Sequence, residues 1–370
     1  MVPESEPRLA PTIRAMSQVL PAEGGLRRVI GDGESTPDGE VDGLGEDELL
    51  ALYRDLVLLR TYDERSVVYH RQGRIGTYAI FWDHEAMQVG SVFALEDRDW
   101  IFPSYRFSAI GLLRGMPVST VLQWWRGHPA GWWNPEEYGV ASICVPIGTH
   151  VPHAVGFAWG SRLKGEDRVA IVHFGDGATS EGSFHEGATF AGVMKAPVIL
   201  FCNNNHWAIS TPVEEQTAAP TLADKAIGYG MHGVRVDGGD VLAVYDVTRE
   251  AATRARAGEG PTFVEAVTYR AAPHATADDP SLYVDEERVA EARENECVGR
   301  YERYLTRLGV LDEELAAEIE QEALERMRAG IAEAEAEPPA DPGLVFEHAY
   351  ADPPPGLADD LAELRRVLGQ

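Results

Sequence analysis

Two short polar motifs follow two apolar segments near the middle of the chain. Segment 168–174 (RVAIVHF) is followed by Gly175-Asp176-Gly177-Ala178, and segment 197–202 by Asn203-Asn204-Asn205. The glycines let the backbone approach a ligand, and a helix beginning near Thr179 or Ser180 would point its positive end there. Asp and Asn offer hard oxygen ligands, which suit a Mg²⁺ ion that bridges to a diphosphate. A GDG sequence alone is also typical of a tight turn with a capping Asp. Its combination with the Asn run after the next strand is the more specific signal for a ligand site.

These two motifs need a parallel sheet to bring them together. Short apolar runs are typical of buried parallel strands, and the turn and helix between these two complete a strand–helix–strand unit. GVRVDGGD and TFVEAVTYR (262–270) predict further strands, with a helix over 246–257 between them. The alternation predicts an α/β fold with a mostly parallel sheet and helices on both faces. In such a sheet, ligands bind beyond the carboxyl ends of the strands, where both motifs lie.

The flanking sequence divides the chain into three parts. Residues 1–44 mix Pro, Gly and acidic residues without sustained periodicity, which predicts a tail or arm. An apolar stripe predicts a helix from Glu46 to about His70, and DWIFPSYR predicts a short strand that ends at Pro103. We assign residues 45–288 to a ligand-binding α/β domain and residues 289–370 to a helical C-terminal extension with a Pro-rich break.

The composition describes a globular and strongly acidic chain. Its 370 residues include 32 Lys plus Arg and 60 Asp plus Glu, for a formal net charge of −28. That charge argues against a nucleic acid or an anionic membrane as partner, because both require a basic patch. No apolar run approaches the roughly 18 residues of a membrane span, and the first residues lack the features of a signal peptide. Cys144, Cys202 and Cys297 are too widely spaced for a disulfide framework or a zinc cluster, so we expect a cytoplasmic protein.

Four longer segments carry a resemblance to a known family. They are FGDGATSEGSFHEG, CNNNHWAIS, VRVDGGDVLAVYDVTREA and EAVTYRAAPHATADDPSLY. In this order they resemble the α subunit of the heterotetrameric, thiamine diphosphate-dependent 2-oxo acid dehydrogenases, the decarboxylating first component of the pyruvate and branched-chain 2-oxo acid complexes. The resemblance extends from about Glu46 to Asp352 and is to forms from salt-adapted microbes in particular.

The resemblance implies a set of site residues. Asp176, the side chain of Asn205 and the backbone carbonyl of Trp207 would bind Mg²⁺, and matching the segment Ala208-Ile209-Ser210 selects Asn205 rather than Asn204. The loop residue His274 would contact the cofactor and assist acyl transfer as the catalytic residue. The residues implied to bind thiamine diphosphate are Tyr105, Arg106, Val145, Ile147, Gly175, Asp176, Gly177, Ala178, Asn205, Trp207, Ile209 and His274.

Three segments depart from the family where we expect substrate to enter. Asp83 stands where the family usually has Gly, residues 107–110 read FSAI, and residues 127–139 read GHPAGWWNPEEYG. The identity of the 2-oxo acid is therefore not transferred from the resemblance. The candidate substrate contacts are Tyr78, Phe81 and Tyr105.

The resemblance also implies partners. The carboxylate that activates the cofactor belongs, in this family, to a separate β subunit, so we expect an α₂β₂ assembly and no activity in the single chain. The acyl group would pass to a lipoylated acyltransferase core. Ala275 and Asp285 stand where the animal enzymes carry phosphorylated serines, which argues against regulation by that route.

Other functions stay open at this point. Branched-chain 2-oxo acids are the favoured substrates, with pyruvate or acetoin as alternatives. A Mg²⁺-dependent phosphohydrolase using Asp176 would lack a second carboxylate at the metal and would leave NNNHWAIS unexplained. A non-catalytic assembly subunit would explain the altered entrance loops, but Asp176, Asn205, Arg106 and His274 are all intact.

The basic residues are almost all arginine, since the only lysines are Lys164, Lys195 and Lys225. A GC-rich genome would explain the arginines, whereas adaptation to a salt-filled cytoplasm would also fit the surplus carboxylates, whose mutual repulsion salt screens. Salt adaptation predicts that the Tm of the full chain rises between low and molar KCl. An unchanged Tm in thermal scans across that range would contradict it.

Overall fold

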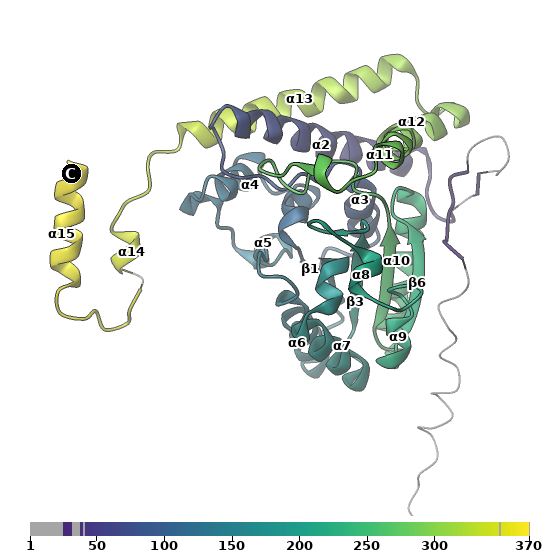
Figure 1. Ribbon diagram of the computed structural model, residues 1–370, viewed down its shortest axis with the longest axis horizontal. Coiled ribbons are helices and arrows are strands. Elements are labelled where there is room, and N and C mark those ends of the chain that lie inside the picture. Colours follow the sequence, from purple (N-terminus) through teal and green to yellow (C-terminus); the bar gives the residue numbers. More distant parts are fainter. Residues whose placement is uncertain (1–24, 32–37, 40, 348, 370) are drawn as a thin grey trace, which may run out of the picture.

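Figure 1 shows the computed structural model, which describes residues 25–31, 38–39, 41–347 and 349–369. Most of the predicted arm over 1–44 lies outside these residues. Its described part is in contact with the sheet, because Arg27 forms a parallel bridge with Val236 at the sheet edge. Among the described residues, no helix has the length and apolar character needed to cross a membrane.

A five-stranded, all-parallel sheet forms the centre of the molecule. Its strands lie in the order β1 (Trp100–Phe102), β2 (Ala170–Gly175), β3 (Val198–Asn204), β7 (Thr262–Val267) and β6 (His232–Asp237). The residues of β2 and β3 are buried almost throughout, as expected for strands covered on both faces. The predicted α/β class with a mostly parallel sheet is confirmed.

Helices cover both faces of this sheet. One hydrophobic cluster joins the strands to α6 (His150–Leu163) and α7 (Gly182–Met194), and another joins them to α3 (Glu85–Phe93) and α10 (Val241–Arg256). Gly90 lets α3 and α10 approach closely, because a Cβ there would lie 2.6 Å from the carbonyl oxygen of Val241. The two layers enclose the strands and leave their carboxyl ends open to a ligand.

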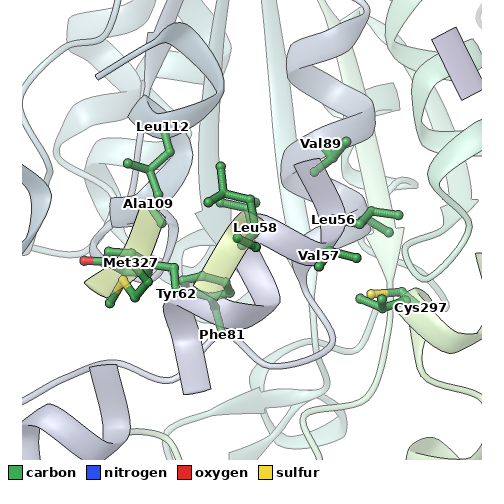
Figure 2. Close-up of a cluster of buried hydrophobic side chains, with 14 of the residues drawn as sticks. Leu56, Val57, Leu58, Tyr62, Phe81, Val89, Ala109, Leu112, Cys297 and Met327 are labelled. Atoms are coloured by element: carbon green, nitrogen blue, oxygen red, sulfur yellow. The ribbon is translucent and has the colours of Figure 1, made fainter. Parts of the chain in front are cut away.

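A third cluster of apolar side chains forms outside α3. The long helix α2 (Glu46–Arg71) packs against α12 (Cys297–Leu308) and α13 (Glu313–Ala336), and α4 (Val118–Trp125) joins the cluster by packing against α13. Figure 2 shows Leu56, Val57 and Leu58 of α2 in this cluster, with Met327 of α13 and Cys297 of α12. Helices on the C-terminal side of residue 288 therefore share a core with α2. The division of the chain at that residue stays a prediction.

The predicted elements differ from the structure mainly at their ends. The helix expected over 246–257 begins earlier, at Val241, because the Asp240 carboxylate accepts a hydrogen bond from the Ala243 amide (3.0 Å) and caps it. The helix expected from Thr179 or Ser180 begins at Gly182, after a 3₁₀ turn. The remaining elements are η1 (Tyr105–Arg114), η2 (Pro129–Gly131), α5 (Pro135–Tyr138), η3 (Asp176–Ser180), β4 (Trp207–Ala208), β5 (Thr211–Pro212), α8 (Val213–Gln216), α9 (Lys225–Gly228), η4 (Pro280–Leu282), α11 (Glu286–Glu294), α14 (Leu344–Glu347) and α15 (Leu357–Leu368).

A buried ion pair network joins α2, α3 and α12. The Arg60 guanidinium donates to Glu85 (2.6 Å) and to Glu296 (2.6 Å), and the Glu85 side chain is completely buried. The Cys297 thiol donates to the other Glu85 oxygen (3.3 Å). Arg60 therefore neutralises two carboxylates that would otherwise be unpaired at the joint between these helices.

Removing Arg60 from this network should strongly destabilise the folded chain. The substitution Arg60→Leu should lower the free energy of unfolding by about 3–5 kcal/mol, because it leaves buried carboxylates unpaired. The matched control is Arg54→Leu on the same helix, whose pair with Glu322 is exposed and should be worth about 0–1 kcal/mol. Urea unfolding of both variants tests this, and equal midpoints would contradict it.

Candidate active site

The two polar motifs meet at the carboxyl ends of β2 and β3. Gly175 lies opposite Asn203 in the parallel register, so Asp176 and Asn205 both follow at the same edge of the sheet. They line one cavity of about 220 Å³. Gly177 lies tightly against the next loop, since a Cβ there would be 2.8 Å from the Ala208 side chain.

Most of the predicted cofactor residues line this same cavity. Val145 is the exception: its side chain is 55% exposed beside the cavity but outside its lining. Further lining residues were not among the predicted cofactor residues, including Ser104, Cys144, His150 and, from the Asn run itself, Asn203. The predicted residues in the lining are Tyr105, Arg106, Ile147, Gly175, Asp176, Gly177, Ala178, Asn205, Trp207, Ile209 and His274.

Asp176 is a buried carboxylate without a cation beside it. It is 1% exposed and forms no ion pair within the described part of the chain; Gln216 donates one hydrogen bond to Oδ2 (2.6 Å). Burial raises the pKa of Asp176 above its ordinary value, and the Gln216 bond offsets this only in part. Asp176, the Asn205 amide and the Trp207 carbonyl form an all-oxygen donor set. An added divalent cation would compensate the buried charge, so these residues fit Mg²⁺.

The three consecutive asparagines have different surroundings. Asn204 points away from the cavity and donates to Glu265 on β7 (2.8 Å). Asn203 and Asn205 line the cavity, as expected from the alternation of side chains along a strand. Asn205 Oδ1 accepts from the Trp207 amide (3.1 Å), whereas the buried Asn203 Oδ1 has no partner in the described structure. The alternation favours Asn205 over Asn204 as the ligand and leaves Asn203 facing the same cavity.

His274 also lines the cavity, in contact with Arg106. The Arg106 guanidinium donates to His274 Nδ1 (2.9 Å) and to the His274 carbonyl (3.1 Å). Because Nδ1 accepts, the hydrogen of the neutral ring is on Nε2, which lies 3.5 Å from the Tyr105 hydroxyl. Burial, followed by the charges of Arg106 and Arg270, lowers the pKa of His274 to about 3. The ring is therefore a neutral hydrogen-bond donor at physiological pH.

Arg106 also donates to the Ile80 carbonyl. Its donors are thus directed to His274 and to the loop before α3. The role in holding a diphosphate, implied by the family, stays a prediction, while the structure shows Arg106 as the residue that orients His274.

Arg270 was missed from the sequence and organises the loop around the cavity. Its side chain is almost fully buried and donates to the carbonyls of Trp207 (3.3 Å) and Ile209. It also donates to the Tyr283 hydroxyl (2.8 Å), which in turn donates to Asp278. The Asp278 carboxylate accepts a hydrogen bond from the His274 amide (2.7 Å), so one arginine connects the loop at 207–209 to the loop that carries His274. Its position at the end of β7, four residues before His274, was the available signal.

Ile209 carries backbone strain at the edge of the cavity. Its φ is 57°, in the left-handed region that β-branched residues rarely adopt. The Arg270 bond to its carbonyl holds this conformation, and 58% of the residue remains exposed beside the cavity. Strain of this kind is retained where the surroundings determine the backbone, as at ligand-binding loops.

Two predicted substrate residues lie elsewhere. Tyr78 and Phe81 are fully buried in the cluster around α2, where the Tyr78 hydroxyl and the Phe81 amide both donate to Asp63 (2.8 and 2.9 Å). The prediction that they contact substrate needs correction, because neither presents surface to the cavity. Of the three candidates, Tyr105 alone lines it.

The departures from the family also lie away from this cavity. Asp83 has a φ of 66°, which explains why glycine suits that position, and its carboxylate accepts from the Cys297 amide (2.8 Å) and from Thr268 (3.2 Å). The FSAI segment 107–110 is buried in the core. The loop 127–139 contributes nothing to the lining. These differences do not alter the walls of the cavity.

The arrangement around His274 predicts how its protonation responds to a mutation. Arg106→Met removes the nearest positive charge and the donor to Nδ1, so the pKa of His274 should rise from about 3 toward 6.5. Histidine ring NMR across a pH titration measures this, with the His274 signal assigned from His274→Gln. Arg98→Met is the control: it removes an exposed arginine that is paired with Glu96 and should leave the pKa of His274 unchanged. An unaltered His274 pKa in Arg106→Met would refute the argument.

The chain is similar to known proteins over most of its length. Residues 53–343 match the family described as the dehydrogenase E1 component. The chain is 43% identical over 328 residues to a 3-methyl-2-oxobutanoate dehydrogenase subunit alpha of Mycobacterium tuberculosis, covering 88% of this chain and 89% of the relative. It is 39% identical over 329 residues to a pyruvate dehydrogenase E1 component subunit alpha of Staphylococcus epidermidis, covering 89% of each. It is 38% identical over 328 residues to a 2-oxoisovalerate dehydrogenase subunit alpha of Bacillus subtilis, covering 86% of this chain and 99% of the relative.

Proposed function

The chain belongs to the dehydrogenase E1 component family, and on that premise we propose that it is the α subunit of a 2-oxo acid dehydrogenase. The reaction is oxidative decarboxylation of a 2-oxo acid with transfer of the acyl group to a lipoyl group. One observation carries the proposal: Asp176 and Asn205 emerge from neighbouring parallel strands onto a single cavity that also contains His274.

The proposed metal ligands are Asp176, Asn205 and the Trp207 carbonyl, and the cofactor is thiamine diphosphate. When bound, thiamine diphosphate supplies the electron sink that allows a 2-oxo acid to lose CO₂. The buried carboxylate of Asp176 would compensate part of the metal charge, and Gln216 holds its Oδ2 in place. The unpartnered Oδ1 of Asn203 is available on the same wall.

His274 is the proposed catalytic residue of this chain. Arg106 holds the tautomer with hydrogen on Nε2, so that atom would be available to donate a hydrogen bond to an oxygen of the bound diphosphate or substrate. Because the ring is neutral, it donates without adding a positive charge to the cavity. Asp278 fixes the His274 backbone and Arg270 fixes Tyr283, so the donor is positioned before substrate binds.

We propose that a β subunit covers the open side of the cavity. Ile147 and Ile209 line it and are about half exposed, as is the adjacent Val145. Exposed apolar side chains around a polar site are typical of a protein interface. In the complete proposal, the chain forms an α₂β₂ assembly in the cytoplasm. This assembly passes the acyl group to a lipoylated acyltransferase core.

The preferred substrate is a branched-chain 2-oxo acid. Two of the relatives above carry names of branched-chain enzymes, which favours that class of substrate. The third is a pyruvate dehydrogenase subunit, so pyruvate is the alternative. Acetoin is a further one. Of the three residues predicted to contact substrate, Tyr105 alone lines the cavity, so we expect the β subunit to contribute to the choice.

The proposal predicts a selective effect at Asp176. Asp176→Asn in the assembly with the β subunit should weaken binding of thiamine diphosphate with Mg²⁺ and lower kcat by at least about 100-fold, through loss of a metal ligand. Asp167→Asn, an exposed carboxylate before the other end of β2, is the matched control and should change neither quantity. Calorimetry measures binding, and dye reduction with 3-methyl-2-oxobutanoate, pyruvate and acetoin measures turnover.

Three results would contradict parts of this proposal. Cofactor binding by Asp176→Asn at the original affinity would exclude the metal site. Decarboxylation by the single chain with cofactor and Mg²⁺ would exclude the need for a β subunit. An assembly that binds no cofactor would identify a non-catalytic subunit.

A further inference from the structure

Asn205 must present one particular end of its side chain to a metal. The two ends of a carboxamide are similar in size, but the oxygen can bind a cation whereas the NH₂ group can only donate hydrogen bonds. A metal ligand of this type therefore requires a neighbour that prevents the amide from turning over. That neighbour should accept a hydrogen bond from the NH₂ end.

His84 is in the required place. It is fully buried and directly precedes α3. Its Nδ1 lies 3.1 Å from the Trp82 carbonyl oxygen, and since a carbonyl can only accept, the hydrogen of the ring is on Nδ1. Nε2 then carries a lone pair, which accepts from the Asn205 NH₂ group at 3.0 Å.

The other end of the amide is consequently directed away from His84. Asn205 Oδ1 accepts from the Trp207 amide (3.1 Å), and both residues line the cavity. Turning the amide over would place its oxygen against the Nε2 lone pair and its NH₂ against the Trp207 amide. Two buried hydrogen bonds would be replaced by two repulsive contacts.

The residues directly before and after His84 in the sequence fix its position. Asp83 accepts the Cys297 amide at the start of α12 (2.8 Å), and Glu85 pairs with Arg60 of α2 (2.6 Å). The His84 backbone amide also donates to the Phe81 carbonyl (2.8 Å). The imidazole therefore reaches Asn205, which is 121 residues away in sequence, from a segment anchored to two helices outside the site.

We propose that His84 is a positioning residue: by accepting from the NH₂ group of Asn205, it directs the Asn205 oxygen to the divalent metal. His84 does not line the cavity, so its effect on a bound metal would pass through Asn205. The inference rests on the metal site of the proposed function and adds the residue that determines how one ligand is presented. Gln216, which donates to Asp176, holds the other side-chain ligand in a comparable way.

The test measures metal affinity in the assembly with the β subunit, using Mn²⁺ detected by electron paramagnetic resonance in the presence of thiamine diphosphate. His84→Leu removes the acceptor and should raise the Kd for Mn²⁺ by about 10–100-fold, the range typical of residues that orient metal ligands. His84→Gln can accept through Oε1 and should restore most of the affinity. In an Asn205→Ala background, His84→Leu should cause no further loss, because its effect passes through Asn205.

A second buried histidine provides the matched control. His173 is fully buried on β2, lies 2.9 Å from the Ser91 hydroxyl and is outside the cavity lining. His173→Leu should disturb the core to a similar degree but leave the Kd for Mn²⁺ unchanged. If His84→Leu does not fold, His84→Asn replaces it, with the same loss expected because the shorter side chain withdraws the acceptor.

Ring ¹⁵N NMR of the unmodified protein adds a readout independent of any folding defect. The signal of His84, assigned from His84→Gln, should show the tautomer with hydrogen on Nδ1. The other tautomer, a folded His84→Leu with the original Kd, or the same loss in the Asn205→Ala background would each overturn the inference. Failure of the unmodified assembly to bind Mn²⁺, or full binding by Asp176→Asn, would overturn the proposed function together with it.

Discussion

The parallel pairing of β2 with β3 is the constraint on which the site depends. In this register Gly175 lies opposite Asn203, so the two strands end side by side at the same edge of the sheet. The polar residues that follow them therefore converge. A shift of β3 by one residue would turn Asn204 into the cavity and Asn205 toward β7. The Asn204–Glu265 hydrogen bond opposes that shift, since it would be lost from a buried position.

The same pairing accounts for the surrounding layers. Parallel strands bury both faces and therefore need helices on both sides, which α6 and α7 supply on one face and α3 and α10 on the other. α3 has two roles, because the segment that begins it also carries His84 to Asn205. The buried network of Arg60, Glu85 and Glu296 ties this segment to α2 and α12, so the stability of the outer helices and the geometry of the site are connected.

Arginine is the residue type that organises the cavity of this acidic chain. Arg106 and Arg270 together lower the pKa of His274, orient its ring and hold the carbonyls of the loop at 207–209. The guanidinium group suits these tasks because it offers several donors in fixed directions, so one side chain can satisfy several buried acceptors. The net charge of −28 is a property of the whole chain. The charged groups around the cavity include two buried arginines, Arg106 and Arg270, and one buried carboxylate, Asp176.

The sequence by itself determined the class of the fold, the order of its strands along the chain and the residues at the ends of β2 and β3. These follow from local properties: apolar runs of strand length, turn residues directly after them and helical periodicity between them. The tertiary structure alone decided that Tyr78 and Phe81 belong to the core, and that His84, Gln216 and Arg270 belong to the site. No local pattern distinguishes a buried histidine that packs from one that holds an amide 121 residues away. That difference arises only when the helices dock on the sheet and each buried polar group must find a partner.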